Sequence, residues 1–397
     1  MSNIVLLGLV SLFTDISTEM VYPILPLYLS AVMGAGPAII GVIEGIAESI
    51  ASIIKLFSGI VADKYGNKKR LAFAGYASST INKIIILFAA SWVGVLLARI
   101  VDRFGKGIRT APRDALVAES AGKADRGKAF GLHKGLDLLG TAIGIMLAWL
   151  ILSGFIFSGS TLGTYKTIFI VSMVPAVIGL VVLAFVKDKK IKRVDKPVSF
   201  NWKNLNIRLK LFLVFIFLFT LGHFSNAFVI LRAVDAGFSK TNAILLHFIY
   251  NMTGSLMSFP AGILSDRFGR KNILCTGYFL YGVVFLGMAL TVNGTAFIAL
   301  FVIYGLYEAL TAGVERALIV DIVPEQHKAG ALGLHSAVVG IGLLPASVIA
   351  GILWERLGPS APFIFGGTMA FVTCIAVFVI LSLKPGRDPE TERAAAA

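Results

Sequence analysis

Charged side chains are scarce in this chain, and several functional motifs are missing from it. Asp, Glu, Lys and Arg make up 15% of the 397 residues, whereas a water-soluble domain carries about 25%. The two cysteines, Cys275 and Cys374, lie in separate apolar runs, so we expect no disulfide framework and no metal site. No Gly-x-x-x-x-Gly-Lys-[Ser/Thr] loop is present, which excludes an ATP-driven machine on this chain alone. We expect no enzyme, no catalytic residues and no cofactor.

Apolar residues take the place of the missing charges. They form 57% of the chain, and the mean hydropathy is +0.84. A helix of about 20 apolar residues spans a bilayer, and the sequence contains twelve such runs, most of them separated by short polar turns. The runs cover approximately residues 4–30, 38–62, 69–90, 92–117, 128–153, 165–186, 208–232, 241–264, 272–292, 295–319, 329–354 and 360–383. The predicted fold class is an all-α membrane protein with twelve transmembrane helices.

The basic residues are unevenly distributed among the connections. The formal net charge is +14, and nine of the Lys and Arg residues fall between Lys187 and Lys210. The stretches 30–38 and 153–164 contain no charge. This asymmetry follows the positive-inside rule, so the basic excess indicates topology and contact with membrane lipid rather than nucleic acid. We predict a multi-pass protein of the inner (plasma) membrane with both termini in the cytoplasm.

An internal repeat divides the chain into two halves. Gly59–Gly66 reads Gly-Ile-Val-Ala-Asp-Lys-Tyr-Gly, and Gly262–Gly269 reads Gly-Ile-Leu-Ser-Asp-Arg-Phe-Gly, 203 residues later. Gly131–His133 is repeated as Gly333–His335, at an offset of 202 residues. Two similar halves in a membrane protein are typical of transporters that bind their substrate where the repeats meet.

The repeated segment resembles the loop motif of the major facilitator superfamily, Gly-x-x-x-Asp-[Arg/Lys]-x-Gly-Arg-Lys. The second copy matches it fully, whereas the first has Asn67 in place of the usual Arg. The resemblance covers the whole chain and implies two pseudo-symmetric six-helix bundles that rock about a midplane site. The expected divisions are 1–186 and 208–384 for the bundles, 187–207 for a cytoplasmic linker and 385–397 for a tail. The Gly-Pro-x-x-Gly ending of helix 5, common in drug/proton antiporters, is absent, because Gly144 is followed by Ile145.

The repeated loops are the expected cytoplasmic gate. Glycines at these positions suit close helix packing and sharp turns, and an aspartate before a helix can cap exposed N–H groups or meet a cation from a neighbouring helix. Arg109 and Arg113 lie nearer the same end, where we expect them to meet Asp63 or Glu119. The alternative is that the loops are basic only to fix topology. The predicted gate residues are Gly59, Asp63, Gly66, Arg109, Arg113, Gly262, Asp266, Arg267, Gly269 and Arg270.

Ionisable residues within the predicted spans are concentrated in the first half. Each costs about 2.5–3.5 kcal/mol to insert into a bilayer, so each invites a functional hypothesis. Carboxylates spaced four residues apart share a helix face, and close carboxylates resist joint ionisation, which suits proton coupling. The alternative is that they are structural partners of nearby cations. The candidates for proton or substrate binding are Asp15, Glu19, Glu44, Glu48, Arg103 and Asp137.

Arg103 lies near the middle of its span and must find a carboxylate there. The available partners are the acids of helices 1 and 2, and such a pair serves equally well as a proton relay or as a structural brace. The matching positions in the second half carry no carboxylate. At the repeat offset, Glu44 and Glu48 align with His247 and Asn251. The second-half cavity candidates are His223, His247, Asn251, Tyr304 and Glu308.

The sequence predicts a secondary active transporter that moves a small organic solute by alternating access, as proton-coupled export. Its expected partners are the solute, protons and membrane lipid, and we expect a monomer. A proton-coupled uptake symporter and a lipid or lysolipid flippase are the alternatives within the same class. A membrane receptor that transports nothing is the alternative from another class; such proteins usually append soluble domains, and the longest polar connection here is about 20 residues.

Overall fold

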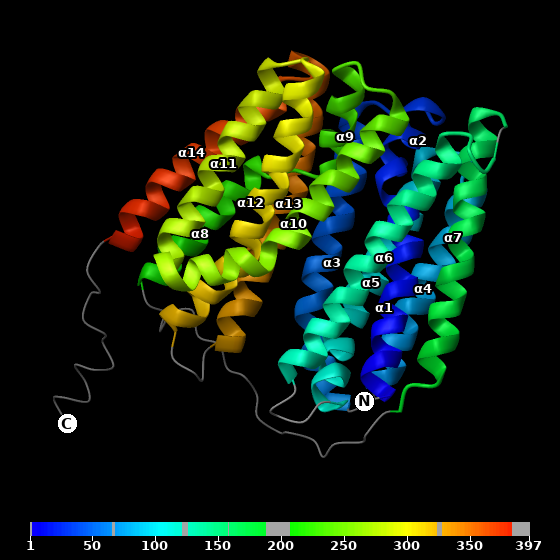
Figure 1. Ribbon diagram of the computed structural model, residues 1–397, viewed down its shortest axis with the longest axis horizontal. Coiled ribbons are helices and arrows are strands. Elements are labelled where there is room, and N and C mark those ends of the chain that lie inside the picture. Colours follow the sequence, from blue (N-terminus) through cyan, green and yellow to red (C-terminus); the bar gives the residue numbers. More distant parts are fainter. Residues whose placement is uncertain are drawn as a thin grey trace.

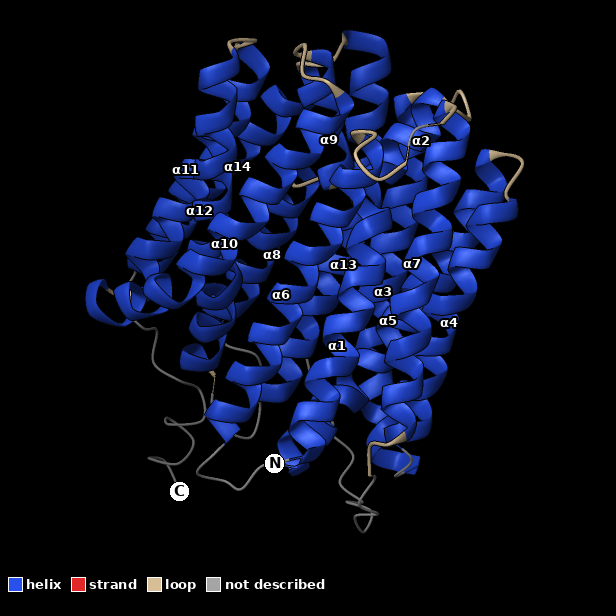
Figure 2. Ribbon diagram, turned by 45° about the vertical axis from the view of Figure 1, so that its right-hand side comes forward, coloured by secondary structure: helices blue, strands red, loops and turns tan. Residues whose placement is uncertain are grey.

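The computed structural model describes residues 2–65, 68–120, 126–157, 159–187, 207–323 and 328–382. Every regular element in these ranges is a helix (Figures 1 and 2). The first bundle consists of α1 (Ser2–Val21), η1 (Tyr22–Ile24), α2 (Leu25–Ala31), α3 (Pro37–Tyr65), α4 (Lys68–Phe88), α5 (Trp92–Ser120), α6 (Arg126–Leu152) and α7 (Thr161–Ala184). The second bundle consists of α8 (Ile207–Gly222), α9 (Asn226–Asp235), α10 (Lys240–Phe268), α11 (Arg270–Leu290), α12 (Gly294–Ile322), α13 (Lys328–Leu357) and α14 (Ala361–Ser382). The predicted all-α architecture is confirmed.

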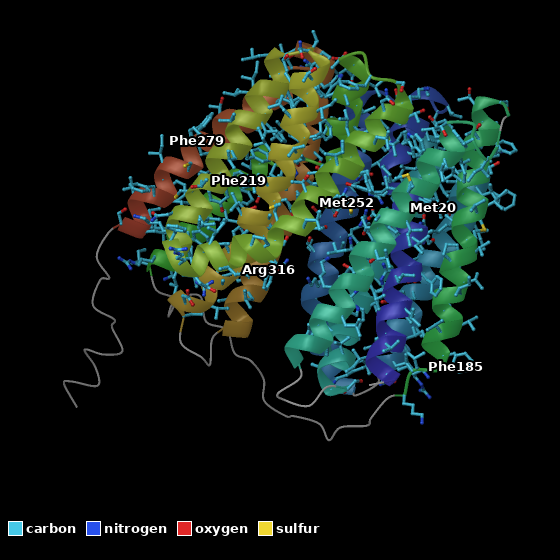
Figure 3. The ribbon with its side chains drawn as sticks, in the orientation of Figure 1. Met20, Phe185, Phe219, Met252, Phe279 and Arg316 are labelled. Atoms are coloured by element: carbon cyan, nitrogen blue, oxygen red, sulfur yellow. The ribbon has the colours of Figure 1, made fainter. Side chains whose placement is uncertain are left out.

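Most of the long helices have the length and composition of membrane spans. Within the described ranges, ten segments are long and apolar enough to cross a membrane, counting α1–α2 and α8–α9 as one segment each. The other two long helices are α5 and α10, which carry more polar residues. Large apolar side chains such as Phe185 and Phe279 point outward (Figure 3) and are 68% and 51% exposed. The outer surface therefore suits lipid, while the polar helices pack inside.

Two expected spans, 4–30 and 208–232, are each broken into two helices. The first break is η1, which contains Pro23 and is followed by Pro26 in α2. The second lies at His223–Ser225, where the Ser225 side chain accepts a hydrogen bond from the N–H of Ala227 and caps α9. Tyr22 and His223 are 201 residues apart, so the two breaks occupy matching places in the repeat.

Glycines allow helices of the first bundle to approach closely. A Cβ atom at Gly144 of α6 would lie 2.6 Å from the carbonyl oxygen of Ile16 on α1. At the crossing of α4 and α5, a Cβ at Gly105 would lie 2.5 Å from the carbonyl oxygen of Gly75. Such contacts let backbones pack without intervening side chains. They also press the polar faces of α1 and α5 against their neighbours.

The two bundles touch mainly through α3 and α13. Gly45 of α3 lies against the backbone of Leu344, and the Ser49 hydroxyl donates a hydrogen bond of 2.5 Å to the carbonyl oxygen of Gly340. These contacts run from Pro37 to Ser52 on α3. We call the end of the molecule that holds Ser2, Ala184 and Ile207 the linker end, and the opposite end the distal end. The ribbons of the two bundles lie together toward the distal end and diverge toward the linker end (Figure 1).

Substitution of Gly105 by alanine tests the close crossing of α4 and α5. The added methyl group would lie 2.5 Å from the Gly75 carbonyl oxygen and 2.8 Å from the Ser78 Cβ. We expect Gly105→Ala to destabilise the protein by about 1–3 kcal/mol, the usual cost of overpacking. Gly135→Ala on α6 is the matched control, since no heavy atom lies within 4 Å of its added Cβ, and removing a helical glycine stabilises by about 0.5–1 kcal/mol. Thermal unfolding in detergent should therefore shift in opposite directions for the two variants.

Candidate functional site

A buried network of charges joins α5 to α3. Arg99 and Arg103 lie four residues apart on one face of α5, with Asp102 between them. The Arg99 Nη2 donates a hydrogen bond of 2.8 Å to the Oε2 of Glu44, and the Arg103 Nη2 lies 3.1 Å from the Oε1 of Glu48. Glu48 is also 3.8 Å from Arg99, and Asp102 is 3.9 Å from both arginines. Each carboxylate thus serves a guanidinium that could not be buried alone.

Tyr22 covers this network from the break in the first span. The Cζ atoms of Arg99 and Arg103 both lie 5.5 Å from the centroid of the Tyr22 ring, within cation–π range. On its other side, the Tyr22 ring lies 6.0 Å from the ring of His247 on α10. The His247 Nε2 is 3.0 Å from the Nδ2 of Asn251. Tyr22 therefore connects the charges of the first bundle to polar groups of the second.

Ser225 makes a direct hydrogen bond between the bundles. Its hydroxyl donates to the Glu44 Oε2 at 3.1 Å, the same oxygen atom that accepts from Arg99. The backbone N–H of Ser225 donates to the Ser347 Oγ on α13 at 3.3 Å. Because Glu44 is only 1% exposed, this bond lies in a dry environment, where loss of a hydrogen-bond partner is costly. We call Tyr22, Glu44, Glu48, Arg99, Arg103, Ser225 and His247 the central site.

Aromatic rings form the wall of the second bundle behind the central site. Tyr250 stacks on Tyr304 with ring centroids 4.5 Å apart, and the Tyr304 hydroxyl donates a hydrogen bond of 2.7 Å to Asn226. The centroid of the His223 ring lies 5.7 Å from that of Phe219 and 6.1 Å from that of Tyr307. The Tyr304 side chain is 1% exposed and its ring packs in the core of the bundle, and its role as a cavity residue stays a prediction. His223, Asn251 and Glu308 are only half-buried.

Solvent reaches part of the central site. The Glu48 side chain is 26% exposed, and Lys106, one turn after Arg103, is exposed although it lies within electrostatic range of Glu19 and Glu48. The Nε atoms of Arg99 and Arg103 are buried without a hydrogen-bond partner. The exposed Lys106 ammonium can therefore donate to a polar molecule, and the two guanidinium groups retain unused donors beneath the surface of the site. No group of three or more His, Cys, Asp or Glu side chains in the described ranges could hold a metal ion.

The remaining acids of the first half lie between α1 and α6. Asp137 accepts hydrogen bonds from Ser11 at 2.8 Å and from Lys134 at 2.6 Å. The side chains of Asp15 and Glu19 pass over Gly140 and Gly144, whose missing Cβ atoms would lie 3.1 Å from theirs. The structure thus separates the predicted acids into two sets, with Glu44 and Glu48 at the arginines and Asp15, Glu19 and Asp137 on the neighbouring face.

Comparison with known proteins identifies the family to which this fold belongs. The family model described as Major Facilitator Superfamily matches residues 7–231 and 210–397. The chain belongs to the major facilitator superfamily. An uncharacterised MFS-type transporter of Methanocaldococcus jannaschii is 37% identical over 386 residues, which are 95% of this chain and 94% of the relative. The hexuronate transporter of Bacillus subtilis is 23% identical, covering 86% of this chain and 85% of the relative.

Solved superfamily structures share the fold. A variant of the nucleoside transporter NupG superposes with a TM-score of 0.81 at 15% identity, over 96% of this chain and 100% of the other. A D-xylose–proton symporter superposes with a TM-score of 0.78 at 15% identity, over 98% of each chain. The predicted fold class and superfamily are confirmed. The chain is an integral membrane transporter and not an enzyme.

The superfamily loop motif is described only in its second copy. Gly66, the surroundings of Gly59 and the Asp63 side chain lie outside the described residues. Asp266 lies 3.6 Å from Arg270 on the next helix, but it caps nothing, because the N-cap of α11 is Gly269. The φ of +87° at Gly269 fits the expected sharp turn. No heavy atom lies within 4 Å of the position that a Cβ atom at Gly262 would take. The close packing of helices expected at Gly262 is therefore wrong.

Other interactions at the linker end complete or correct the predicted gate. Arg270 also forms an ion pair with Asp321, and the Arg267 guanidinium lies over the Phe268 ring. Arg109 and Arg113 were expected to meet Asp63 or Glu119; the pairing with Glu119 is wrong, and the Asp63 side chain lies outside the described residues. Glu119 pairs instead with Lys68 from α4, Arg109 hydrogen-bonds to Ser79 and lies 4.7 Å from the Tyr76 ring centroid, and Arg113 pairs with Asp114. A pocket of about 210 Å³ lies at this end, lined in part by Gly262, Asp266 and Arg270.

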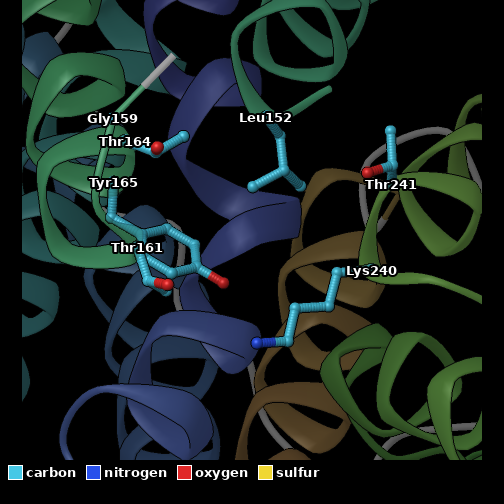
Figure 4. A pocket seen from close by; sticks show the side chains of 7 residues that line it. All are labelled: Leu152, Gly159, Thr161, Thr164, Tyr165, Lys240 and Thr241. Atoms are coloured by element: carbon cyan, nitrogen blue, oxygen red, sulfur yellow. The ribbon is translucent and has the colours of Figure 1, made fainter. Parts of the chain in front are cut away.

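A second pocket lies at the distal end, away from every predicted site residue. It holds about 300 Å³ and is bordered by α7 and α10 (Figure 4). Tyr165 and Lys240 come to it from different bundles. The Tyr165 hydroxyl is buried without a hydrogen-bond partner. Because the α3–α13 contacts close the molecule toward this end, the pocket lies outside the central site.

Sequence reasoning missed three residues of the central site. Arg99 was left out of the predicted site, although its position one turn before Arg103 on the same helix face was a usable signal. Tyr22 was overlooked because aromatic residues are ordinary in membrane helices, but the neighbouring Pro23 marked a break. Ser225 carried no signal of its own, since its role depends on where the second bundle meets the first.

Removing one partner of the Arg99–Glu44 pair should destabilise the protein strongly. Arg99→Gln leaves a carboxylate that is 2% exposed without its main counter-charge, which costs about 3–5 kcal/mol for a buried pair. The double variant Arg99→Gln/Glu44→Gln removes both charges and should recover most of that loss. Thermal unfolding of the two single variants and the double variant gives the coupling directly. Additive losses in the double variant would show that the two side chains do not stabilise each other.

Proposed function

We propose that the chain is a proton-coupled secondary transporter that binds a small, polar organic solute at the central site. The observation that carries this proposal is the pair of matched helix breaks beside the site. Tyr22 lies at one break and Ser225 at the other. In transporters built from repeats, discontinuous helices expose polar backbone and side chains at the substrate site. Here they meet the charges of α3 and α5.

The arrangement of the bundles supports alternating access. The α3–α13 contacts hold the bundles together from Pro37 to Ser52, and the ribbons diverge toward the linker end (Figure 1). The basic residues near Lys187 and Lys210 favour the linker end as the cytoplasmic side of the inner (plasma) membrane. On this assignment the structure is an inward-facing state, which admits solute from the cytoplasm.

Binding of solute would exchange one set of charged contacts for another. Glu48 is the partly exposed carboxylate, so a polar group of the solute can replace it at Arg103. The freed Glu48 then turns toward Lys106, which is within electrostatic range. The same change strains the adjacent contact of Arg99 with Glu44, and Glu44 is also bonded to Ser225 of the other bundle. A local exchange at α5 thereby reaches the contact that closes the distal end.

Proton-coupled export is our leading proposal for direction, because an inward-facing site fed from the cytoplasm suits removal of a solute. Proton-coupled uptake is the second candidate. It is favoured by the names of similar proteins, which include a hexuronate transporter and a D-xylose–proton symporter. Both modes use the same central site and differ in whether solute and proton move in opposite directions or together.

A proton-release assay in inside-out membrane vesicles separates the two modes. The vesicles are made acidic inside, their pH gradient is reported by a quenched dye, and a hexuronate, a nucleoside, xylose and an organic cation are added in turn. Export by antiport predicts recovery of dye fluorescence with a transported solute, because protons leave as the solute enters. Uptake by symport predicts instead that solute added outside right-side-out vesicles makes the medium alkaline.

Arg103→Gln should reduce the solute-dependent signal at least about tenfold, since it removes a donor of the central site worth more than about 1.4 kcal/mol. Lys166→Gln is the matched control, because Lys166 is an exposed cation on α7 away from the site. A solute that accumulates with no proton movement in either vesicle orientation would contradict the coupling. Full activity of Arg103→Gln would contradict the central site.

A further inference from the structure

A second titratable cluster lies in the second bundle, outside the central site. The Tyr278 hydroxyl on α11 donates a hydrogen bond of 2.9 Å to the Oε1 of Glu315 on α12. The other carboxylate oxygen of Glu315 is 3.2 Å from the Nε2 of His335 on α13. The Glu315 and His335 side chains are 14% and 9% exposed. One carboxylate therefore joins three helices near the linker end, where a proton from water can still reach it.

The tyrosine, glutamate and histidine of this cluster each have a counterpart in the first bundle. The counterpart of the glutamate is an arginine, so the charge at that position is reversed. At the offset of 202 residues, Tyr278 corresponds to Tyr76 and His335 to His133, whereas Glu315 corresponds to Arg113. Arg113 lies beside Tyr76 and within electrostatic range of His133. A guanidinium stays protonated at every physiological pH. The first bundle therefore has a permanent charge where the second has a group that can gain or lose a proton.

The partner of Glu315 also distinguishes it from the acids of the central site. Glu44 and Glu48 face arginines, which stabilise their charged forms. Within the described part of the chain, no Lys or Arg side chain lies within ion-pair distance of Glu315, and its partner is a histidine. A histidine is the side chain whose charge changes most readily between pH 5 and 8. The Glu315–His335 pair can thus exchange a proton without breaking an arginine pair.

The groups around the pair are few and belong to identified elements. Glu308 and Arg316 lie on α12 itself, with Arg316 exposed at the linker end (Figure 3). Tyr278 comes from α11 and His335 from α13. From the break between α8 and α9, His223 lies within electrostatic range of Glu315. Tyr307, on α12, is a further titratable neighbour among the described residues.

We propose that Glu315 and His335 form the proton-binding site of this transporter, and that the proton acts on the second bundle while the solute acts on the first. This inference rests on the proton coupling proposed above. A proton that enters from the linker end is taken up by the hydrogen-bonded Glu315–His335 pair and changes how the carboxylate holds Tyr278 and His335, so α11, α12 and α13 respond through one shared acceptor. No covalent bond forms or breaks. His223 lies within electrostatic range of Glu315 and adjoins the break that holds Ser225, and through it the change reaches Glu44.

Distance measurements between spin labels test this proposal without a known solute. One label replaces Phe130 on α6 and the other replaces Phe268 on α10, two exposed positions near the linker end of different bundles. The native Cys275 and Cys374 are replaced by serine. We expect the distance distribution of the parent protein in lipid nanodiscs to shift between about pH 5 and about pH 8, the range in which histidine pairs titrate. Glu315→Gln should remove that pH response, since the amide can still accept from Tyr278 but cannot bind the proton.

His335→Gln should shift the midpoint of the response by at least about one pH unit, because it removes the titrating partner of Glu315. Glu355→Gln is the matched control: Glu355 is an exposed acid on the same helix as His335, and its variant should respond as the parent does. Size-exclusion chromatography of every variant verifies the fold. An unchanged pH response in Glu315→Gln, or loss of the response in Glu308→Gln alone, overturns the assignment.

The vesicle assay distinguishes failure of this site from failure of the proposed function. If the parent protein moves protons with its solute and Glu315→Gln does so equally well, the site is wrong and the coupled transport stands. If the parent protein accumulates solute without proton movement, the proposed coupling is wrong, and the assignment of the proton site is wrong as well. If Glu315→Gln still exchanges labelled solute for unlabelled solute but no longer follows the pH gradient, both stand.

Discussion

The pairing of buried arginines with buried glutamates is the constraint on which the rest of the structure depends. Arg99 and Arg103 are buried in the first bundle, where an unpaired guanidinium costs several kcal/mol. Their need for Glu44 and Glu48 fixes the face that α5 presents to α3. It also explains the close glycine crossing with α4 and the position of Tyr22 over both guanidinium groups. Glu44 then extends the network to Ser225, so the charge balance of one bundle sets its contact with the other.

The fold was predictable to a large degree, because apolar run length and the repeated glycine–aspartate loop are properties of the sequence itself. The helix breaks at Tyr22 and His223 were missed, since a break inside an apolar run barely alters hydropathy. For the site, pairing of Arg103 with an acid of helix 1 or 2 followed from charge balance alone, but the choice of Glu48 depends on how α3 and α5 cross. The false pairing of Arg109 with Glu119 arose in the same way, because Lys68 from α4 lies closer.

Symmetry and its loss have separate roles in this molecule. The helix breaks beside Tyr22 and Ser225 recur at the repeat offset, and so do the tyrosine and histidine positions, Tyr76 with Tyr278 and His133 with His335. The charges do not recur. The first bundle contains fixed arginine–carboxylate pairs, whereas the second contains an aromatic wall and a carboxylate whose partners at bonding distance, among the described residues, are a tyrosine and a histidine. On this ground we propose that solute recognition belongs to one bundle and proton binding to the other.

The hydrogen bond from Ser225 to Glu44 offers the most direct test of the claim that the central site controls the contact between bundles. Spin labels at Phe155 and Leu290, both 81% exposed near the distal end, report the separation of the bundles there. Ser225→Ala removes the bond but retains the Arg99–Glu44 pair, and Ser225→Thr keeps a hydroxyl as the control. The account predicts a larger population of long distal distances in Ser225→Ala and a parent-like distribution in Ser225→Thr. Identical distributions in Ser225→Ala and the parent protein would contradict it.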